Sequence, residues 1–170
     1  MGGVLDQLTG YRESQMPDPT QLDLTYDFIL RTFVKHGQAP HFTDIGRAFG
    51  VSPDEGRRLL HDLMAAGLPN WLFPSTDLIA SFAPFNNVPT HYRISIDGQQ
   101  KWFAQCGLES LAMSWLFPDK PILVEAPCLD CGEPVRVTVR NGVIEREDPR
   151  GIRFYVDVPL REWGANLPFA

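Results

Sequence analysis

Two groups of residues in this chain have types and spacings that could do chemistry. In the first, Cys106 lies where a predicted strand runs into a predicted helix, and Glu109 follows three residues later on the same side of that helix. Backbone N–H groups at a helix N-terminus favour an anion, which predicts a Cys106 thiol pKa below the reference of ~8.5. A thiolate beside a carboxylic acid can bind a soft metal and protonate a group held on that metal. The alternative is a buried structural cysteine and a glutamate that complements the helix dipole.

The second group is the motif CLDCG, which contains Cys128 and Cys131. Such a motif is half of a zinc ribbon, a redox pair, or two thiols in a structural turn. No second CxxC completes a ribbon, and Pro127 and Pro134 predict a turn between strands. A zinc site of three cysteines and one histidine is the remaining metal alternative, with Cys106, Cys128, Cys131 and one of His36, His41, His61 or His91 as ligands.

The composition narrows the class of protein that must position these groups. The chain has 170 residues, of which 44% are hydrophobic, so it predicts one globular domain or two small subdomains that share a core. Three cysteines do not make a disulfide scaffold. The net charge of −6 argues against a general nucleic-acid binder, because attraction to phosphate needs a basic surface.

Targeting signals are not evident in the sequence. The N-terminus lacks a basic segment followed by an apolar one, and Asp6 occupies the position where a myristoylation motif has Ser or Thr. No apolar run approaches the ~18 residues that span a bilayer. We therefore predict a cytoplasmic protein without a membrane partner, in a compartment where thiols stay reduced.

The N-terminal half is predicted to be helical. Residues 1–20 contain glycine, proline and polar residues and are expected to form a flexible arm, and residues 21–85 a winged-helix-like subdomain. Its first helix starts near residue 20 and ends at Gly37. Residues 44–49 form a second helix, and residues 71–85 a strand and wing.

The second and third of these helices have recognisable start signals. Thr43 is the predicted N-cap of the second helix. The third begins at Ser52, with Pro53 at its first position and Glu55 completing a capping box. Both starts therefore follow from local sequence alone.

A winged helix raises the alternative of a DNA-binding regulator. Residues 21–85 carry five basic and seven acidic side chains. The candidate recognition helix offers Arg57 and Arg58 but also three carboxylates, at Asp54, Glu55 and Asp62. A DNA-facing surface of net negative charge is disfavoured, so nucleic acid is not the expected partner.

Residues 86–170 are predicted to form a mixed, mainly antiparallel β core with one short internal helix, so the fold class is α+β. The dipeptides Asp97-Gly98 and Asn141-Gly142 predict hairpin turns. The predicted strands cover residues 91–96, 99–103, 122–125, 134–140, 142–146 and 154–158, and the helix covers residues 106–116.

Four segments of the chain together resemble the alkylmercury lyase (organomercurial lyase) family. They are NVPTHYR (87–93), WFAQCGLESL (102–111), VEAPC (124–128) and GEPVRVTV (132–139). The resemblance extends over roughly residues 22–165 and is most specific around Cys106. The order of elements, a winged-helix-like part before a mixed β core, also agrees with the family.

The resemblance implies cleavage of a carbon–mercury bond, giving a hydrocarbon and Hg(II) as bound product. In the family, two cysteine thiolates capture the organomercurial substrate, and a carboxylic acid near the first cysteine protonates the leaving carbon. Cys106 matches the first cysteine and Glu109 matches the acid, where the family usually has Asp. No organic cofactor is implied, and cellular thiols are expected as partners.

The second family cysteine has no match in this chain. It follows a segment that resembles residues 161–170, and no cysteine occurs after Cys131. Three explanations compete: the chain stops short of that residue, Cys128 or Cys131 replaces it, or the protein binds a metal or organometal through Cys106, Cys128 and Cys131 without cleavage. The missing segment would also add a strand and helix to the core, which a homodimer partner could supply instead.

Overall fold

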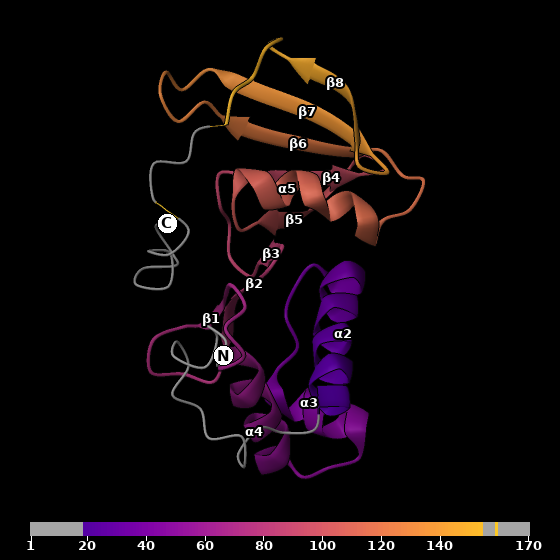
Figure 1. Ribbon diagram of the computed structural model, residues 1–170, viewed down its shortest axis with the longest axis vertical. Helices are drawn as coiled ribbons and strands as arrows, with labels where there is room; N and C mark the ends of the chain where they lie inside the picture. Colours follow the sequence, from indigo (N-terminus) through magenta and orange to yellow (C-terminus); the bar gives the residue numbers. More distant parts are fainter. Residues whose placement is uncertain (1–18, 155–158, 160–170) are drawn as a thin grey trace, which may run out of the picture.

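The computed structural model describes residues 19–154 and residue 159. Most of the predicted arm (1–20) and most of the predicted strand 154–158 lie outside the described residues, as does the segment 161–170. The described chain is α+β, with helices first and an antiparallel sheet after them (Figure 1). This confirms the predicted fold class.

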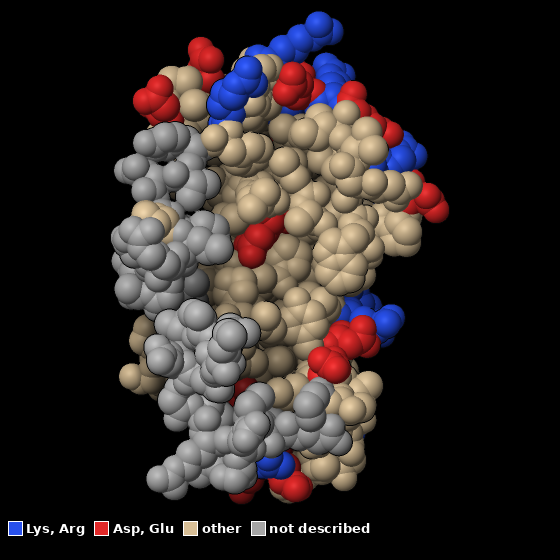
Figure 2. Space-filling model, in the orientation of Figure 1, with Lys and Arg blue, Asp and Glu red and all other residues tan. Residues whose placement is uncertain are grey.

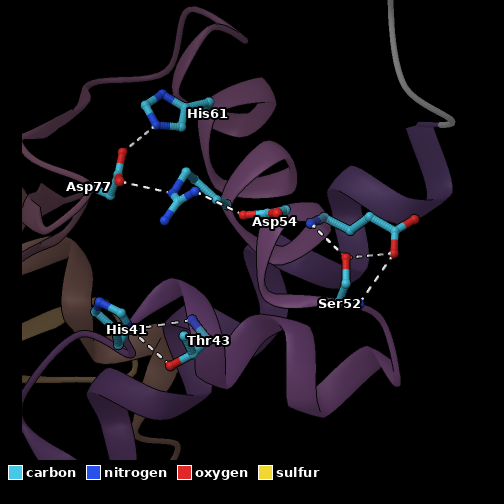
Figure 3. Close-up of polar contacts among 8 residues, drawn as sticks. His41, Thr43, Ser52, Asp54, His61 and Asp77 are labelled. Carbon is cyan, nitrogen blue, oxygen red and sulfur yellow. Dashed lines mark hydrogen bonds and ion pairs between the residues drawn. The ribbon is translucent and has the colours of Figure 1, made fainter.

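Three helices form the N-terminal part: α2 (Pro19–His36), α3 (Phe42–Phe49) and α4 (Pro53–Met64). The predicted capping box of α4 is present, because the Ser52 hydroxyl accepts from the Glu55 N–H and the Glu55 carboxylate accepts from the Ser52 N–H (Figure 3). The apolar side of each helix packs into the core. The capping box fixes the residue at which α4 begins, and thereby which of its residues face the core.

The N-cap of α3 differs from the prediction. His41, not Thr43, caps this helix, since its ring Nδ1 accepts from the Thr43 N–H at 3.4 Å (Figure 3). The Asp44 carboxylate accepts from the His41 N–H at 3.1 Å and completes a capping box. The prediction was wrong because an imidazole nitrogen replaces the usual hydroxyl or carboxylate acceptor.

One sheet of eight strands rises from the helices along the long axis of the molecule (Figure 1). Its spatial order is β1-β2-β3-β5-β4-β6-β7-β8, and every pair of neighbours in the described residues is antiparallel. The strands are β1 (Asn70–Leu72), β2 (Ile79–Phe82), β3 (Phe85–Asn86), β4 (Arg93–Ile96), β5 (Gln99–Ala104), β6 (Ile122–Pro127), β7 (Pro134–Arg140) and β8 (Val143–Asp148). Between β5 and β6 lie α5 (Gly107–Ala112) and the 3₁₀ helix η2 (Met113–Leu116).

Both predicted hairpin turns are confirmed. Asp97 and Gly98 have φ of 52° and 76° between β4 and β5, and Asn141 and Gly142 have φ of 49° and 78° between β7 and β8. Two successive positive φ values match the twist of the flanking strands and favour Asn, Asp and Gly. These turns therefore set the register of two of the hairpins.

Helices and sheet share one hydrophobic core. The Trp102 indole N–H on β5 donates to the Phe33 carbonyl on α2 at 2.7 Å, and the Phe33 ring stacks on Phe85 at 4.9 Å. Because β3 pairs with both β2 and β5, the sheet is continuous through residues 85 and 86. The division into two subdomains at that point stays a prediction.

The arginines of α4 do not offer free positive charge. Arg57 pairs with Asp54 and Asp77, each at 3.0 Å, and Arg58 pairs with Asp62 at 3.3 Å (Figure 3 shows Asp54 and Asp77). Both guanidinium groups are therefore neutralised locally, which further disfavours a phosphate-facing role for this helix. Winged-helix character stays a prediction.

Within residues 19–154, the longest helix is α2, and no helix combines the length and the apolarity that crossing a bilayer requires.

Candidate active site

Cys106 occupies the junction between β5 and α5. It is the N-cap residue of α5, with an extended backbone (φ −147°, ψ 176°). The preceding residue is anchored on both sides, because the Gln105 N–H donates to the Pro84 carbonyl at 3.1 Å and the Gln105 side chain donates to the Pro69 carbonyl at 2.7 Å. The loop and strand ends from the N-terminal half therefore fix the position of Cys106.

The three-residue spacing places the Cys106 thiol beside the Glu109 carboxylate, and each group shifts the pKa of the other. Both side chains are half-buried. Cys106 is the N-cap residue, but its side chain makes no capping hydrogen bond. The first turn of α5 thus gathers one thiol and one carboxyl group at a single position.

The predicted direction of the Cys106 pKa is wrong. Burial raises the pKa of this thiol above its ordinary value, and the Glu109 charge and the hydrogen bond to its carboxylate raise it further. The amides of Glu109 and Leu108 act in the opposite direction but do not outweigh burial. The sequence shows that Cys106 lies at a helix N-terminus, which favours a lower pKa. Burial of the thiol, which raises the pKa, depends on the packing of segments that are distant in the sequence.

Glu109 is poised between its protonated and ionised forms. Burial raises its pKa to about 7, although the hydrogen bonds from the Cys106 thiol and backbone act to lower it. Its Oε2 atom is buried and has no hydrogen-bond partner. A buried carboxylate oxygen without a partner is costly and uncommon in folded proteins, so this atom is available for a reacting group.

Two tyrosines flank this pair, and the sequence assigned neither of them a role. Tyr26 on α2 has a pKa raised by burial and by the charge of Glu109. Tyr92, which precedes β4, has a pKa raised by burial and by the charge of Cys106. The helical spacing of Tyr26 indicated only a core-facing residue, so its approach to Glu109 could not be predicted.

Gly107 allows aromatic side chains to lie close to the pair. A Cβ atom at this position would lie 2.7 Å from Phe154 Cε1 and 3.3 Å from Tyr92 Cε1. The first of these distances is too short for a real contact. The absence of a side chain at Gly107 therefore lets Phe154 cover the start of α5.

A cleft of about 570 Å³ begins at Gly107 and Tyr92 and runs between α5 and the β6–β7 hairpin. Aliphatic side chains form much of its lining, among them Leu111, Val124, Val135, Val137 and Ile152. Figure 2 shows a largely uncharged area (tan) in the middle of the molecule, with acidic atoms (red) inside it and charged residues around it at the top, along the right edge and at the bottom. Such a setting suits an apolar organic group and a protected proton transfer.

Cys128 and Cys131 lie in the turn between β6 and β7, as the flanking prolines predict. Both line the same cleft as Gly107. Hydrogen bonds from the backbone N–H groups of Cys131 and Asp130, and from the Cys131 thiol, lower the pKa of Cys128. This direction is the opposite of that at Cys106.

The zinc alternative finds no support in the described residues. Among them, no group of three or more His, Cys, Asp or Glu side chains is placed to hold a metal ion. Cys106, Cys128 and Cys131 are all described and all free, yet they form no such group with each other or with a histidine. Structural zinc requires four ligands, so this arrangement does not fit it.

Comparison with known proteins gives two findings. The sequence model of the alkylmercury lyase family matches residues 85–168. The solved structure described as the mercury-bound form of MerB2 is 22% identical, with a TM-score of 0.55 over 77% of this chain and 68% of that one. No curated protein matches the chain. The structural likeness establishes a shared fold, and the matched segment contains Cys106, Glu109 and the 128–131 turn.

Proposed function

Because residues 85–168 match the sequence model of the alkylmercury lyase family, we propose that the chain is an organomercurial lyase that cleaves a carbon–mercury bond by protonolysis. Cys106 captures the mercury atom and Glu109 delivers the proton. The observation that carries this assignment is the buried, unpartnered oxygen of Glu109, whose carboxyl group lies beside the Cys106 thiol. Together they provide a nucleophile and a general acid within one turn of helix.

The first step is capture of the substrate. The Cys106 sulfur forms a bond to mercury and displaces the ligand that accompanies the organic group. The thiol proton moves to the neighbouring Glu109 carboxylate. A raised thiol pKa is compatible with this route, because the thiolate forms only as mercury binds and its proton is kept within the site.

The second step is protonolysis. The Glu109 carboxylic acid gives its proton to the carbon atom, the electron pair of the carbon–mercury bond forms the new carbon–hydrogen bond, and a hydrocarbon leaves. A pKa of about 7 leaves the acid form accessible near neutral pH. A second thiolate, supplied by a cellular thiol, completes the coordination of Hg(II) beside Cys106. The chain's own groups are sufficient for proton transfer, so no organic cofactor takes part.

The hydrophobic cleft positions the organic group. Tyr92 and Phe154 lie over the start of α5, and the aliphatic lining continues away from them. Gly107, which lines the cleft, lies between Cys106 and Glu109 in the sequence, so a methyl or phenyl group buried there would lie beside the first turn of α5. Glu109 is one methylene longer than the aspartate usual in the family, and a misplacement of about 1 Å can cost ~10²-fold in rate.

The test is phenylmercury turnover in excess monothiol, measured as benzene release. Wild type should release benzene, and Cys106→Ser should lose this activity because the soft ligand for mercury is gone. The thermal unfolding midpoint of Cys106→Ser reports whether the fold is retained. Absence of benzene release by the folded wild type contradicts lyase function, whereas full activity of Cys106→Ser contradicts only the assignment of Cys106.

A further inference from the structure

We propose that Cys128 and Cys131 form a second site, a two-thiolate chelate for a soft divalent metal ion, and that Hg(II) is its ligand. Both side chains line the cleft that begins at Gly107, the residue next to Cys106. Neither cysteine is in a disulfide, and Cys131 is exposed. The site is therefore separate from the Cys106–Glu109 pair but opens into the same cleft.

The turn that carries the two thiols is well defined. The last paired residues of β6 and β7 are Pro127 and Pro134, so six residues close the hairpin. The Cys128 N–H donates to the Glu133 carbonyl at 2.7 Å, and the Gly132 N–H donates to the Cys128 carbonyl at 2.9 Å. These bonds cross the turn and hold the two sulfur atoms on one short loop.

The two thiols belong to the same six-residue turn and line the same cleft, so both sulfur atoms can reach one metal ion there. Sulfur is thus the ligand atom presented to a metal here. Thiolate pairs select soft metal ions over hard ones.

The number of ligands narrows the choice of metal further. No third His, Cys, Asp or Glu side chain joins the pair among residues 19–154. Zinc requires four ligands in a structural site, whereas a mercuric ion is satisfied by two thiolates. A two-sulfur site at the cleft therefore fits Hg(II) and does not fit zinc.

Binding balances without any redox partner. The two sulfur–mercury bonds of the pair replace the bonds to two monothiolates, which leave as thiols with the protons of Cys128 and Cys131, and mercury stays Hg(II). The second bond forms within one short loop, where the effective concentration of the second thiol is on the order of millimolar or higher. The pair should therefore hold mercury against monothiols. That the pair accepts Hg(II) from Cys106 after cleavage rests on the proposed lyase function. The affinity of the pair for Hg(II) does not.

Equilibrium dialysis of full-length Cys106→Ser separates the two sites, because only the 128–131 pair remains. The reduced protein is loaded with one equivalent of Hg(II) and dialysed against about a tenfold excess of a monothiol. We expect about one Hg(II) per chain to be retained. Cys106→Ser/Cys131→Ser should retain at least tenfold less, and Leu129→Ala, which changes an exposed side chain of the same turn, should behave as the parent does.

Three results would overturn the proposal. The first is loss of mercury from Cys106→Ser to the monothiol, and the second is equal retention by the variant that also lacks Cys131. The third is retention of Zn(II) by the same protein in a parallel dialysis, which would show a site with more than two ligands. Because Cys106→Ser is expected to lack lyase activity, none of these results depends on turnover, and failure of one proposal leaves the other intact.

Discussion

The cysteines of this chain lie in two contrasting environments. Cys106 is half-buried where a strand meets a helix and lies beside a carboxyl group, and burial raises its pKa. Cys128 lies in a hairpin turn beside a second thiol, and backbone N–H groups lower its pKa. Backbone amides act to lower the thiol pKa in both places, so the difference comes from burial and from the nearby carboxylate. The comparison shows that a thiol's chemistry is set by what covers it as well as by which amides face it.

The largest expected effect comes from removing the Glu109 carboxylic acid, which lies beside Cys106. Glu109→Gln should reduce benzene release from phenylmercury by ~10²–10⁴-fold, because general acid catalysis is lost while Cys106 remains. Glu109→Asp should retain more activity than Glu109→Gln, since it keeps the acid. The measurement is single-turnover hydrocarbon release.

The matched control for this substitution is Glu145→Gln, which removes a surface carboxylate on β8 that pairs with Arg140 at 2.7 Å. It should not change turnover. If Glu109→Gln is as active as Glu145→Gln, then Glu109 is not the proton donor.

The burial of Glu109 should also be visible in stability. Its pKa is about 7 in the folded chain and ~4.3 when unfolded. Between these values the folded chain holds more protons, so the free energy of unfolding falls as pH rises through that window and stays lower above it. Glu109→Gln is neutral throughout. It should therefore raise the free energy of unfolding by on the order of 2 kcal/mol near pH 8.5 and by much less near pH 5.

Urea unfolding of wild type and Glu109→Gln at the two pH values measures this difference. Glu145→Gln, at an exposed position, should show no comparable pH-dependent gain. A gain for Glu109→Gln that is the same at both pH values would mean that ionisation of this group is not the cause.

Alkylation rates compare the two kinds of thiol directly. Near neutral pH, iodoacetamide should label Cys128 about tenfold or more faster than Cys106, because the thiolate reacts and burial opposes its formation at Cys106. Peptide mass spectrometry after timed quenching gives the rate at each site. Faster labelling of Cys106 would reverse the comparison.

The smallest expected effect concerns the turn alone. Gly132 has φ of 77° and open space around its Cα, so Gly132→Ala would meet no clash and suffer only backbone strain. We expect a loss of about 1 kcal/mol in the free energy of unfolding, and a smaller loss for Gly132→Asn, because Asn tolerates this conformation better. Chemical unfolding of the two variants tests the order. Equal stability of all three proteins would show that the turn is not held in this conformation.

Local sequence determined much of this protein. The capping box of Ser52 and Glu55 begins α4, and the dipeptides at residues 97–98 and 141–142 form the turns of two hairpins. The three-residue spacing places Glu109 beside Cys106. Each depends on interactions within a few residues, which a sequence displays. The resemblance to alkylmercury lyases could likewise be found from short motifs, because their residues are adjacent in the chain.

Tertiary structure decided the properties that depend on distant segments. Residues from α2, from the start of β4 and from the end of the described chain cover the first turn of α5. That covering removes water, which raises the pKa of both Cys106 and Glu109 and outweighs the helix amides. It also places the 128–131 turn on the cleft that begins at Gly107. Desolvation depends on every neighbour in space, so spacing along the chain could place Glu109 beside Cys106 but could not give the direction in which the pKa of the thiol shifts.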